Sequence, residues 1–424
     1  MNVLVIGGGA REHAICWKLR QSSKLTNLFC TPGNGGIGEL AKLGNVAADD
    51  ISGLVNFSME HDIDFVVVGP EVPLSLGIVD ELEKVGIPAF GPNKQCAQLE
   101  SSKIFTKRFL ARHQIPTAQY VECYSQEECL GNLGIFSYPM VLKADGLAGG
   151  KGVIIAENKE EAIAGIETLM EQKAFGIAGD KVVIEEYLSG VEASALCFVD
   201  ENRILPMDSC QDYKRIWDHD QGPNTGGMGS YSPSLLFDEE RWELLRKEVL
   251  DPALAGFQRE GLLFKGVLFI GLMWSGKSWK VIEFNTRFGD PETQSLLPRL
   301  KNDLLEIMMA TVGNRLDQVQ LEWDDRKTIT VNLVSKGYPG KYKTGEEIFG
   351  MEKVAHDILL FHGGTRSEKT SKDILSFWTD GGRVISVTGL GETLEAAREK
   401  VYHNISKIHF EGAFYRKDIG GRPL

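Results

Sequence analysis

Short apolar runs alternate with glycine- and proline-containing turns through the N-terminal quarter of the chain, and this alternation constrains the fold more than any other feature. The runs are residues 3–6, 28–30 and 65–68, and the turns that follow them are residues 7–9, 31–36 and 69–71. After the first turn, the apolar spacing of residues 11–19 predicts an amphipathic helix. Strands and helices that alternate in this way indicate a doubly wound parallel sheet, whose ligands bind beyond the carboxyl ends of the strands. We therefore expect an N-terminal α/β domain with a ligand against these turns.

The first glycine turn does not match a dinucleotide-binding fingerprint. After Gly7 and Gly9 the third glycine is due at position 12, where the chain has Glu12. A carboxylate is an unfavourable neighbour for a pyrophosphate, so NAD and FAD rank low as ligands. The turn still precedes a predicted helix, whose first N–H groups could hold one phosphate with help from Arg11. A purely structural turn is the alternative.

The composition is that of an ordinary protein of several packed units, with 424 residues, 42% of them hydrophobic and 25% charged. The formal net charge of −13 argues against nucleic acid or an anionic membrane as the main partner, because both are bound by basic surfaces. Seven cysteines without a C-x-x-C pair fit neither a disulfide framework nor a zinc site. No basic leader precedes the first apolar run, and no apolar stretch is long enough to cross a membrane. We therefore expect a cytoplasmic protein that acts on small molecules, with neither nucleic acid nor a membrane as partner.

A second glycine-rich segment, residues 143–153, contains two lysines. Its glycines would let backbone N–H groups approach a polyphosphate, and Lys143 and Lys151 would add positive charge. The segment is not a Walker loop, because only three residues separate Gly146 from Gly150 and a glycine, Gly152, follows the lysine. From these residues alone, a different kind of phosphate loop and a simple turn are equally open.

A predicted hairpin over residues 267–285 carries two oxygen-bearing side chains near its end. Glu283 and Asn285 alternate with apolar residues, so both are expected on one face of the second strand. Two hard oxygen ligands followed by Arg287 suit a magnesium ion that bridges substrate phosphates. A solvent-facing polar edge is the alternative for so short a pattern.

Three further segments complete the organisation. A helix is predicted from residue 101, with Ser102 as its N-cap and Lys103 in its first turn, where a cation opposes the helix dipole unless an anionic ligand is near. The long, polar and glycine-rich connection over residues 211–229 is of a kind that more often carries function than not. After an acidic linker, the tail from residue 327 predicts short strands and one helix, which indicates a separate α+β unit.

The order of these features resembles the ATP-grasp superfamily. The features are Lys103, Lys143 with its glycine loop, Glu185-Glu186, and Glu283-Phe-Asn-Thr-Arg287. Several motifs more specifically resemble the glycinamide ribonucleotide synthetase family. They are Ile6-Gly-Gly-Gly-Ala-Arg-Glu-His13, Pro32-Gly-Asn34, Val68-Gly-Pro-Glu71, Lys143-Ala-Asp-Gly-Leu-Ala148, Gly222-Pro-Asn-Thr-Gly-Gly-Met-Gly229, Glu283-Phe-Asn-Thr-Arg-Phe-Gly-Asp-Pro-Glu292 and Arg416-Lys-Asp-Ile-Gly420. The resemblance runs from residue 2 to about residue 420, and the runs at 222–229 and 283–292 are its most specific parts.

The resemblance implies an enzyme of de novo purine biosynthesis that joins glycine to 5-phosphoribosylamine through a glycyl phosphate, giving glycinamide ribonucleotide, ADP and phosphate. It implies ATP and Mg²⁺, or Mn²⁺, as cofactors, and we expect a monomer or weak homodimer. Three domains are implied: a doubly wound domain over residues 1–102, an ATP-grasp domain over 103–326 with a mobile lid at about 117–189, and a small C-terminal α+β domain over 327–424.

The same resemblance implies the site residues. Those expected at ATP are Lys103, Lys143, Gly146, Gly149, Gly150, Lys151, Gly152, Glu185, Glu186, Tyr187, Leu188 and Glu192. Those expected at the other substrates are Gly7, Gly9, Arg11, Asn34, Glu71, Asp212, Lys214, Arg287, Pro291 and Glu292. The expected metal ligands are Glu283 and Asn285, and the expected catalytic residues are Arg287, Lys143 and Asp212. Phosphoryl transfer needs positioning and charge neutralisation rather than a nucleophile, which suits a site without a catalytic serine or cysteine.

Two other functions remain open. One is another carboxylate-activating ATP-grasp enzyme, including one similar to biotin carboxylase, because Thr286 completes a Glu-x-Asn-Thr-Arg run. The runs at 6–13 and 68–71 disfavour it. The other is a nucleotide-binding module without turnover, and the presence of Lys143, Glu283 and Arg287 argues against that. Residues 267–273 contain no acid, which leaves open how a second Mg²⁺ would be held.

Overall fold

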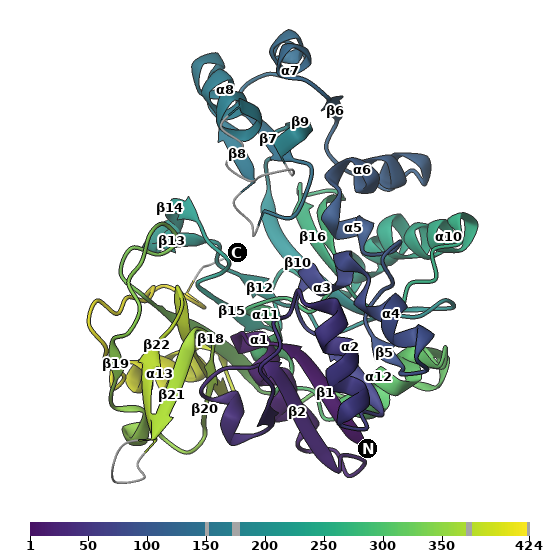
Figure 1. Ribbon diagram of the computed structural model, residues 1–424. Coiled ribbons are helices and arrows are strands. Elements are labelled where there is room, and N and C mark those ends of the chain that lie inside the picture. The colour runs from purple at the N-terminus through teal and green to yellow at the C-terminus, as the bar shows by residue number, and fades with distance from the viewer. Residues whose placement is uncertain (149–151, 172–178, 370–374, 422–424) are drawn as a thin grey trace.

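The structure, a computed structural model, describes residues 1–148, 152–171, 179–369 and 375–421. Its N-terminal region is a five-stranded parallel sheet in the order β3-β2-β1-β4-β5. Strands β1 and β2 lie side by side in it (Figure 1). The strands are β1 (Asn2–Gly7), β2 (Asn27–Pro32), β3 (Lys42–Leu43), β4 (Phe65–Val68) and β5 (Ala89–Phe90), and the helices are α1 (Ala10–Leu19), α2 (Ile51–Glu60), α3 (Glu71–Leu76) and α4 (Ile78–Lys84). Val3 and Val5 pack on the side of α1, whereas Leu4 and Ile6 pack on the side of α2 and α4. Helices on both faces confirm the predicted doubly wound sheet.

The central region is an antiparallel sheet in the order β11-β10-β16-β17. Its strands are β10 (Val191–Val199), β11 (Ile204–Pro206), β16 (Gly266–Trp274) and β17 (Trp279–Asn285). The helices around it are α5 (Gln98–Ser101), α6 (Lys103–Arg112), α9 (Glu239–Leu245), α10 (Asp251–Glu260), α11 (Glu292–Leu296) and α12 (Leu304–Val312). Phe109, Phe257 and Trp279 are fully or almost fully buried in one core between α6, α10 and the sheet. The predicted β16–β17 hairpin and the Ser102 N-cap, which accepts from Phe105 N, are both confirmed.

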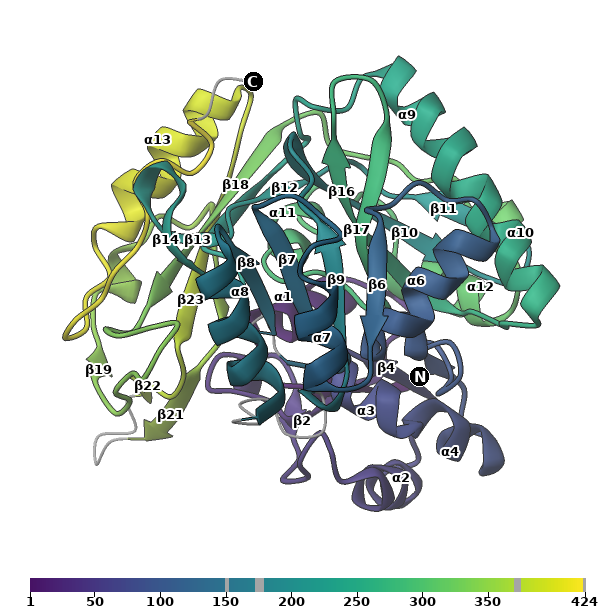
Figure 2. The ribbon, with the colours of Figure 1, turned by 90° about the horizontal axis from the view of Figure 1, so that it is seen from above.

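A second, smaller antiparallel sheet, which we call the lid sheet, has the order β6-β9-β7-β8. It consists of β6 (Tyr120–Cys123), β7 (Met140–Ala144), β8 (Val153–Ala156) and β9 (Val182–Glu186), with α7 (Gln126–Asn132) and α8 (Lys159–Ile166). The lid sheet has a core of its own, which includes Leu142, Ile166 and Ile184. Seen from above, the lid sheet with α7 and α8 lies over the middle of the molecule (Figure 2). The chain that leads into β6 is joined to the central sheet, because Val281 N of β17 donates to Pro116 O at 2.7 Å.

The C-terminal region contains an antiparallel sheet in the order β12-β15-β18-β23-β20, covered by α13 (Leu394–Ile405). Its strands are β12 (Gln211–Asp212), β15 (Gly229–Ser232), β18 (Lys327–Val334), β20 (Ile358–His362) and β23 (Arg383–Gly391). A three-stranded sheet, β19 (Glu347–Ile348), β22 (Leu375–Thr379) and β21 (Thr365–Lys369), and a hairpin, β13 (Arg215–Trp217) and β14 (Gln221–Asn224), complete it. The larger sheet therefore combines strands from both sides of residue 327. The domain boundaries at 102/103 and 326/327 stay predictions.

All seven cysteines are free and buried, as expected of incidental thiols. Within the part of the chain that the structure describes, no helix has both the length and the apolar character needed to cross a membrane.

Candidate active site

Glu283 and Asn285 lie together at the end of β17, where Asn285 Nδ2 donates to Glu283 Oε1 at 3.3 Å. Burial alone would raise the pKa of Glu283, but the charges of Lys103, Lys214 and Lys143 hold it well below its usual range. The Lys103 ammonium is 3.5 Å from Glu283 Oε2. Glu283 is therefore an anion surrounded by cations, and three lysines that are distant in sequence converge on it.

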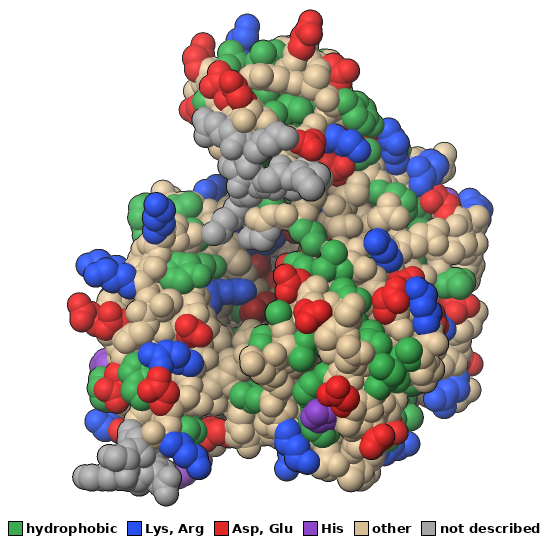
Figure 3. All heavy atoms as spheres, in the orientation of Figure 1, with side chains coloured by type: hydrophobic (Ala, Val, Ile, Leu, Met, Phe, Trp, Pro, Cys, Tyr) green, Lys and Arg blue, Asp and Glu red, His purple; other side chains and the backbone are tan. Residues whose placement is uncertain are grey.

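The donor chemistry of this pair fits a divalent ion that prefers oxygen ligands. Among the described residues no three His, Cys, Asp or Glu side chains form a group that could hold a metal. An ion held by Glu283 and Asn285 would complete its shell with water and substrate phosphates, which is usual for Mg²⁺. Figure 3 shows a hollow below the lid in which acidic and basic side chains gather.

Lys143 approaches Glu283 from the lid sheet, and Lys103 approaches it from the first turn of α6. Lys143 lies on β7, is buried, and donates to Ile282 O of β17 at 3.1 Å. Just beyond β7, Asp145 Oδ1 accepts from Ser102 Oγ at 2.9 Å. The Asp145 carboxylate thereby joins the end of β7 to the start of α6. This contact places Lys143 and Lys103 beside Glu283.

The glycine loop closes at its base, where Ala144 N donates to Gly152 O at 2.9 Å and Gly146 N donates to Ala144 O at 3.2 Å. Three of the residues expected at ATP, Gly149, Gly150 and Lys151, lie outside the described residues.

The end of β9 and the chain up to the start of β10 contain the residues expected at the adenine and ribose. Glu185 is buried and ion-paired, with Lys143 Nζ 3.0 Å from its Oε1. Glu186 pairs with Lys280 at 3.0 Å, and burial, which alone would raise its pKa, is outweighed by hydrogen bonds so that the pKa is lowered. Tyr187 is exposed, Leu188 is half-buried, and Glu192 lies 3.8 Å from Lys214. The side chains of Glu185 and Glu186 thus serve neighbouring lysines, and the chain beyond them is open to a ligand.

Arg287 lies between two carboxylates of the N-terminal half. Its Nη2 is 3.1 Å from Glu100 Oε1 and its Nε is 3.5 Å from Glu71 Oε2. Glu100 also accepts from Thr286 N at 2.7 Å, and burial raises the pKa of Glu100 in spite of the nearby arginine. The guanidinium is thus held by Glu71 and Glu100, which precede and follow β5.

A second cluster combines Asp212, Lys214 and Glu292. Glu292 is buried at the start of α11, and burial, followed by the charge of Asp212, raises its pKa to about 8. Burial alone would lower the pKa of Lys214, but Asp212, Glu192 and Glu283 raise it. The cluster thus places the charged side chain of Lys214 between carboxylates and close to Glu283.

The N-terminal loops are held by their own polar contacts. Arg11 donates to Phe288 O at 3.2 Å and to Glu12 at 2.5 Å, and Gly9 N donates to the same carboxylate at 2.6 Å. Asn34 Nδ2 donates to Gly8 O at 2.9 Å and to His362 O, at the end of β20 in the C-terminal region, at 2.6 Å. Glu12, which stands where the fingerprint has its third glycine, therefore caps the start of α1. These contacts give Arg11 and Asn34 structural roles, and their expected substrate contacts stay predictions. Gly7, with φ +122°, accepts from Gly33 N.

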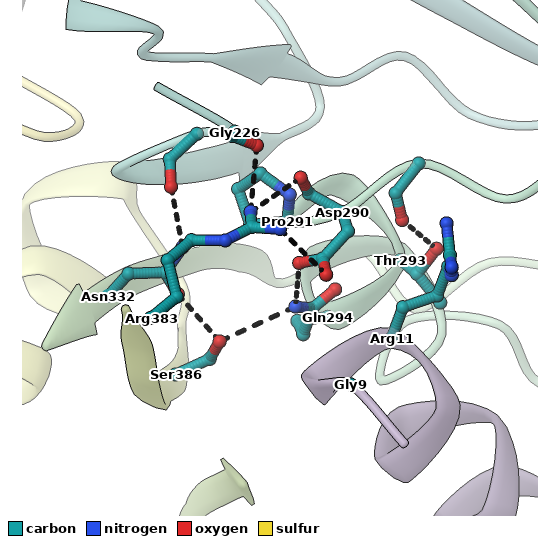
Figure 4. Close-up of polar contacts among 12 residues, drawn as sticks. Gly9, Arg11, Gly226, Asp290, Pro291, Thr293, Gln294, Asn332, Arg383 and Ser386 are labelled. Atoms are coloured by element: carbon teal, nitrogen blue, oxygen red, sulfur yellow. Dashed lines mark hydrogen bonds and ion pairs between the residues drawn. The ribbon is translucent and has the colours of Figure 1, made fainter. Parts of the chain in front are cut away.

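A pocket of about 410 Å³ lies between the start of α1 and the C-terminal region. Its lining includes Gly8, Gly9, Asn224, Asp290, Tyr338 and Arg383. Arg383 Nη1 donates to Gly226 O at 2.7 Å and to Asp290 O at 2.8 Å, and its Nη2 is 3.0 Å from Asp290 Oδ2 (Figure 4). Next to Asp290, Pro291 O accepts from Ser230 Oγ at 2.9 Å. One arginine thus joins three segments at the rim of the pocket.

Sequence reasoning did not single out Glu100, Lys107 or Arg383. Lys107 follows Lys103 by one helical turn, which is a signal, although lysines with that spacing are common on solvated helix faces. Glu100 and Arg383 carry no local signal, because their partners are far away in the sequence.

Comparison with known proteins gives matches along the whole chain. Family models described as Phosphoribosylglycinamide synthetase match as N domain over residues 1–100, ATP-grasp (A) domain over 101–293 and C domain over 328–422. A phosphoribosylamine–glycine ligase of Caldanaerobacter subterraneus subsp. tengcongensis is 46% identical over 419 residues, which cover 99% of each chain. One of Vibrio vulnificus is 46% identical over 428 residues, which cover 100% of this chain and 99% of the relative.

Solved structures agree with these matches. The phosphoribosylamine–glycine ligase of Thermotoga maritima has a TM-score of 0.85 and 32% identity, and the match covers 99% of this chain and 100% of that one. A biotin carboxylase domain of Hydrogenobacter thermophilus has a TM-score of 0.73 at 15% identity, covering 97% and 91%, which shows a shared fold alone. The resemblance to the ATP-grasp superfamily is thereby confirmed, and the chain belongs to the phosphoribosylglycinamide synthetase family.

Proposed function

We propose that this chain catalyses the ATP-dependent ligation of glycine to 5-phosphoribosylamine, giving glycinamide ribonucleotide, ADP and phosphate in purine biosynthesis. Membership of the family and the names of its relatives support this activity. The observation that carries it is the convergence of Lys103, Lys143 and Lys214 on Glu283, beneath the lid sheet. Such a site neutralises phosphate charge, and phosphoryl transfer asks the protein for positioning and charge neutralisation rather than for a nucleophile.

The carboxylate of glycine is a poor acyl donor, and its phosphorylation makes an acyl phosphate that the amine of phosphoribosylamine can attack. Lys103 and Lys143 would bind the ATP phosphates, and Glu283 and Asn285 would hold the divalent ion. When bound, the ion supplies charge neutralisation at the phosphate oxygens. Arg287, fixed by Glu71 and Glu100, would orient the acyl phosphate as it forms.

The remaining residues divide between the two ends of the site. At the nucleotide end, we place the adenine against the chain at residues 185–188 and the ribose hydroxyls at Glu192. At the other end, we place Asp212, Lys214 and Glu292 around the glycine and the attacking amine, because their charges lie together beside Glu283. We propose Mg²⁺, or Mn²⁺, as the ion, a cytoplasmic location, and a monomer or weak homodimer.

We place the sugar phosphate of phosphoribosylamine in the pocket between α1 and the C-terminal region. Support comes from its volume of about 410 Å³, from the glycines at the start of α1 and from Arg383 at its rim. The substrate would then span from this pocket to Glu292 and Arg287, which both follow β17 closely in the sequence.

ADP release tests the proposed function. The assay contains ATP, Mg²⁺ and glycine, with phosphoribosylamine generated in place from ribose 5-phosphate and ammonia, and mass spectrometry identifies the product. ADP and glycinamide ribonucleotide are expected only when every component is present. ADP release that follows bicarbonate instead of glycine would indicate a biotin carboxylase-like activity, and ATP binding without turnover would indicate a nucleotide-binding module; either result overturns the proposal.

A further inference from the structure

Lys107 is a buried lysine on α6 that contacts none of the residues placed at the metal or at the acceptor. Its side chain is 3% exposed, and its ammonium lies 3.0 Å from Glu185 Oε2 and donates to Thr117 Oγ1 at 2.8 Å. Burial lowers the pKa of Lys107 to about 8, with the charge of Glu185 opposing this shift. A desolvated cation of this kind is costly unless it is paired, so its position depends on Glu185.

The carboxylate of Glu185 is shared between two lysines, one at each oxygen. Lys107 lies at Oε2, and Lys143 Nζ lies 3.0 Å from Oε1. All three side chains are at most 5% exposed. Oε1 accepts no hydrogen bond within the described residues, and the Lys143 ammonium donates instead to Ile282 O. Lys143 is thus held near Glu185 by charge, and the remaining N–H groups of its ammonium can turn toward an anion.

The three residues come from both sides of the junction between the lid sheet and the body. Glu185 and Lys143 lie on the adjacent strands β9 and β7 of the lid sheet, whereas Lys107 lies on α6. On α6, Lys107 is one turn beyond Lys103, which reaches Glu283. Helix α6 therefore supplies Lys103 to Glu283, one of the two proposed metal ligands, and Lys107 to Glu185, which lies beside Lys143.

The charges set what Lys143 can offer to a phosphate. With Lys107 in place, Glu185 balances one of two ammonium groups, so a net positive charge remains at Lys143. Without Lys107, Glu185 and Lys143 form a neutral buried pair, and their mutual attraction draws the ammonium toward the carboxylate. The loss of net positive charge and the shift of the Lys143 ammonium toward Glu185 would each weaken its contact to the transferring phosphate.

We propose that Lys107 is a positioning residue for phosphoryl transfer, which acts by holding Glu185 and, through it, the ammonium of Lys143. The proposal rests on the proposed function, in which Lys143 binds ATP phosphates. A purely structural Lys107 would hold α6 against the lid sheet without affecting Lys143. The two possibilities differ in whether the effect of Lys107 on ATP depends on Glu185.

A double-mutant cycle with Lys107→Met, Glu185→Gln and the combined variant separates them. We expect Lys107→Met to lower kcat/KM for ATP by about 10- to 100-fold, because a misplaced group at the reacting phosphate has effects of this size. In the Glu185→Gln background the same change is expected to alter kcat/KM by less than about twofold, because the carboxylate through which Lys107 acts is already gone. A change of about twofold is the limit within which the effects of independent sites usually add. Lys107→Arg, which keeps the charge, is expected to recover part of the loss.

Arg108→Met is the matched control. Arg108 is the next residue of α6 and also ties this helix to the lid sheet, since its Nη2 is 2.6 Å from Glu122 Oε2 of β6. It contacts neither Glu185 nor Lys143, and its side chain is exposed. Its removal is expected to leave kcat/KM for ATP within about twofold of the wild type.

An equal loss from Lys107→Met in both backgrounds, or a loss no larger than that of Arg108→Met, would refute the positioning role. Thermal unfolding of every variant identifies any that fails to fold, and Lys107→Arg then carries the comparison. The cycle is repeated on the dissociation constant of ATP, measured by calorimetry without glycine. Absence of ligase turnover in the wild type would overturn the proposed function, whereas additive effects on ATP binding would overturn the role of Lys107.

Discussion

Replacement of Arg383 by methionine removes a cation that joins three segments of the molecule. The guanidinium donates to Gly226 O at 2.7 Å and to Asp290 O at 2.8 Å, and pairs with Asp290 Oδ2 at 3.0 Å. Methionine keeps much of the apolar stem and loses every one of these contacts. The change therefore tests how far the rim of the pocket depends on a single side chain.

The magnitude follows from the number of contacts and from their exposure. A hydrogen bond that involves a charged group contributes about 1.5–3 kcal/mol, and breaking a buried ion pair costs about 3–5 kcal/mol. The Arg383 side chain is 25% exposed, so water can reach part of what it leaves behind. Asp290 also keeps a second partner, because Gln294 Nε2 donates to its Oδ1 at 2.7 Å. We therefore expect a loss of about 2–3 kcal/mol, below the sum of the individual contacts.

Urea unfolding, followed by tryptophan fluorescence, measures this loss as a lower transition midpoint. Arg326→Met is the control, because Arg326 pairs with Asp324 at 2.7 Å on the surface and exposed pairs contribute at most about 1 kcal/mol. In the ligase assay, Arg383→Met is also expected to raise KM for phosphoribosylamine more than KM for ATP. Equal midpoints for the two variants, together with an unchanged KM for phosphoribosylamine, would refute the reasoning.

Two further predictions concern the carboxylates of the site. Glu283→Ala is expected to abolish turnover and its dependence on Mg²⁺ while the protein stays folded; ADP release across a Mg²⁺ titration measures this, and retained activity would show that the ion is held elsewhere. Burial raises the pKa of Glu292 from 4.5 to about 8, so the folded state binds this proton more tightly than the unfolded chain, and the resulting stability is fully present below about pH 4.5 and lost as the pH rises to about 8. Glu292→Gln is expected to flatten that decline in melting temperature, measured without substrates, and an unchanged slope would show that Glu292 titrates normally.

Features that depend on neighbours in sequence could be predicted. The placement of Glu283 and Asn285 on one face follows from the two-residue period of a strand, and Ser102 caps its helix for equally local reasons. The first sheet could be predicted as well, because an apolar run followed by a glycine turn is a local signal.

Contacts between distant segments could not be predicted in the same way. Arg11 and Asn34 are of types that bind phosphate, yet their side chains contact Phe288 O and His362 O, which no local pattern indicates. The sharing of Glu185 by Lys107 and Lys143 depends on the register of β9 against β7 and on the approach of α6. Such contacts are set by tertiary packing, which residue types alone do not specify.

The sheet that combines β12 and β15 with β18 also has a consequence during synthesis of the chain. Strand β15 ends at Ser232, and its partner β18 begins at Lys327, about 100 residues later. At roughly 5–20 residues per second, a ribosome needs about 5–20 s to make the intervening segment. During that interval β15 has emerged without the strand that covers its edge, and an uncovered edge is open to pairing with another chain. A nascent molecule of this protein is therefore open to misassembly from the emergence of β15 until β18 emerges.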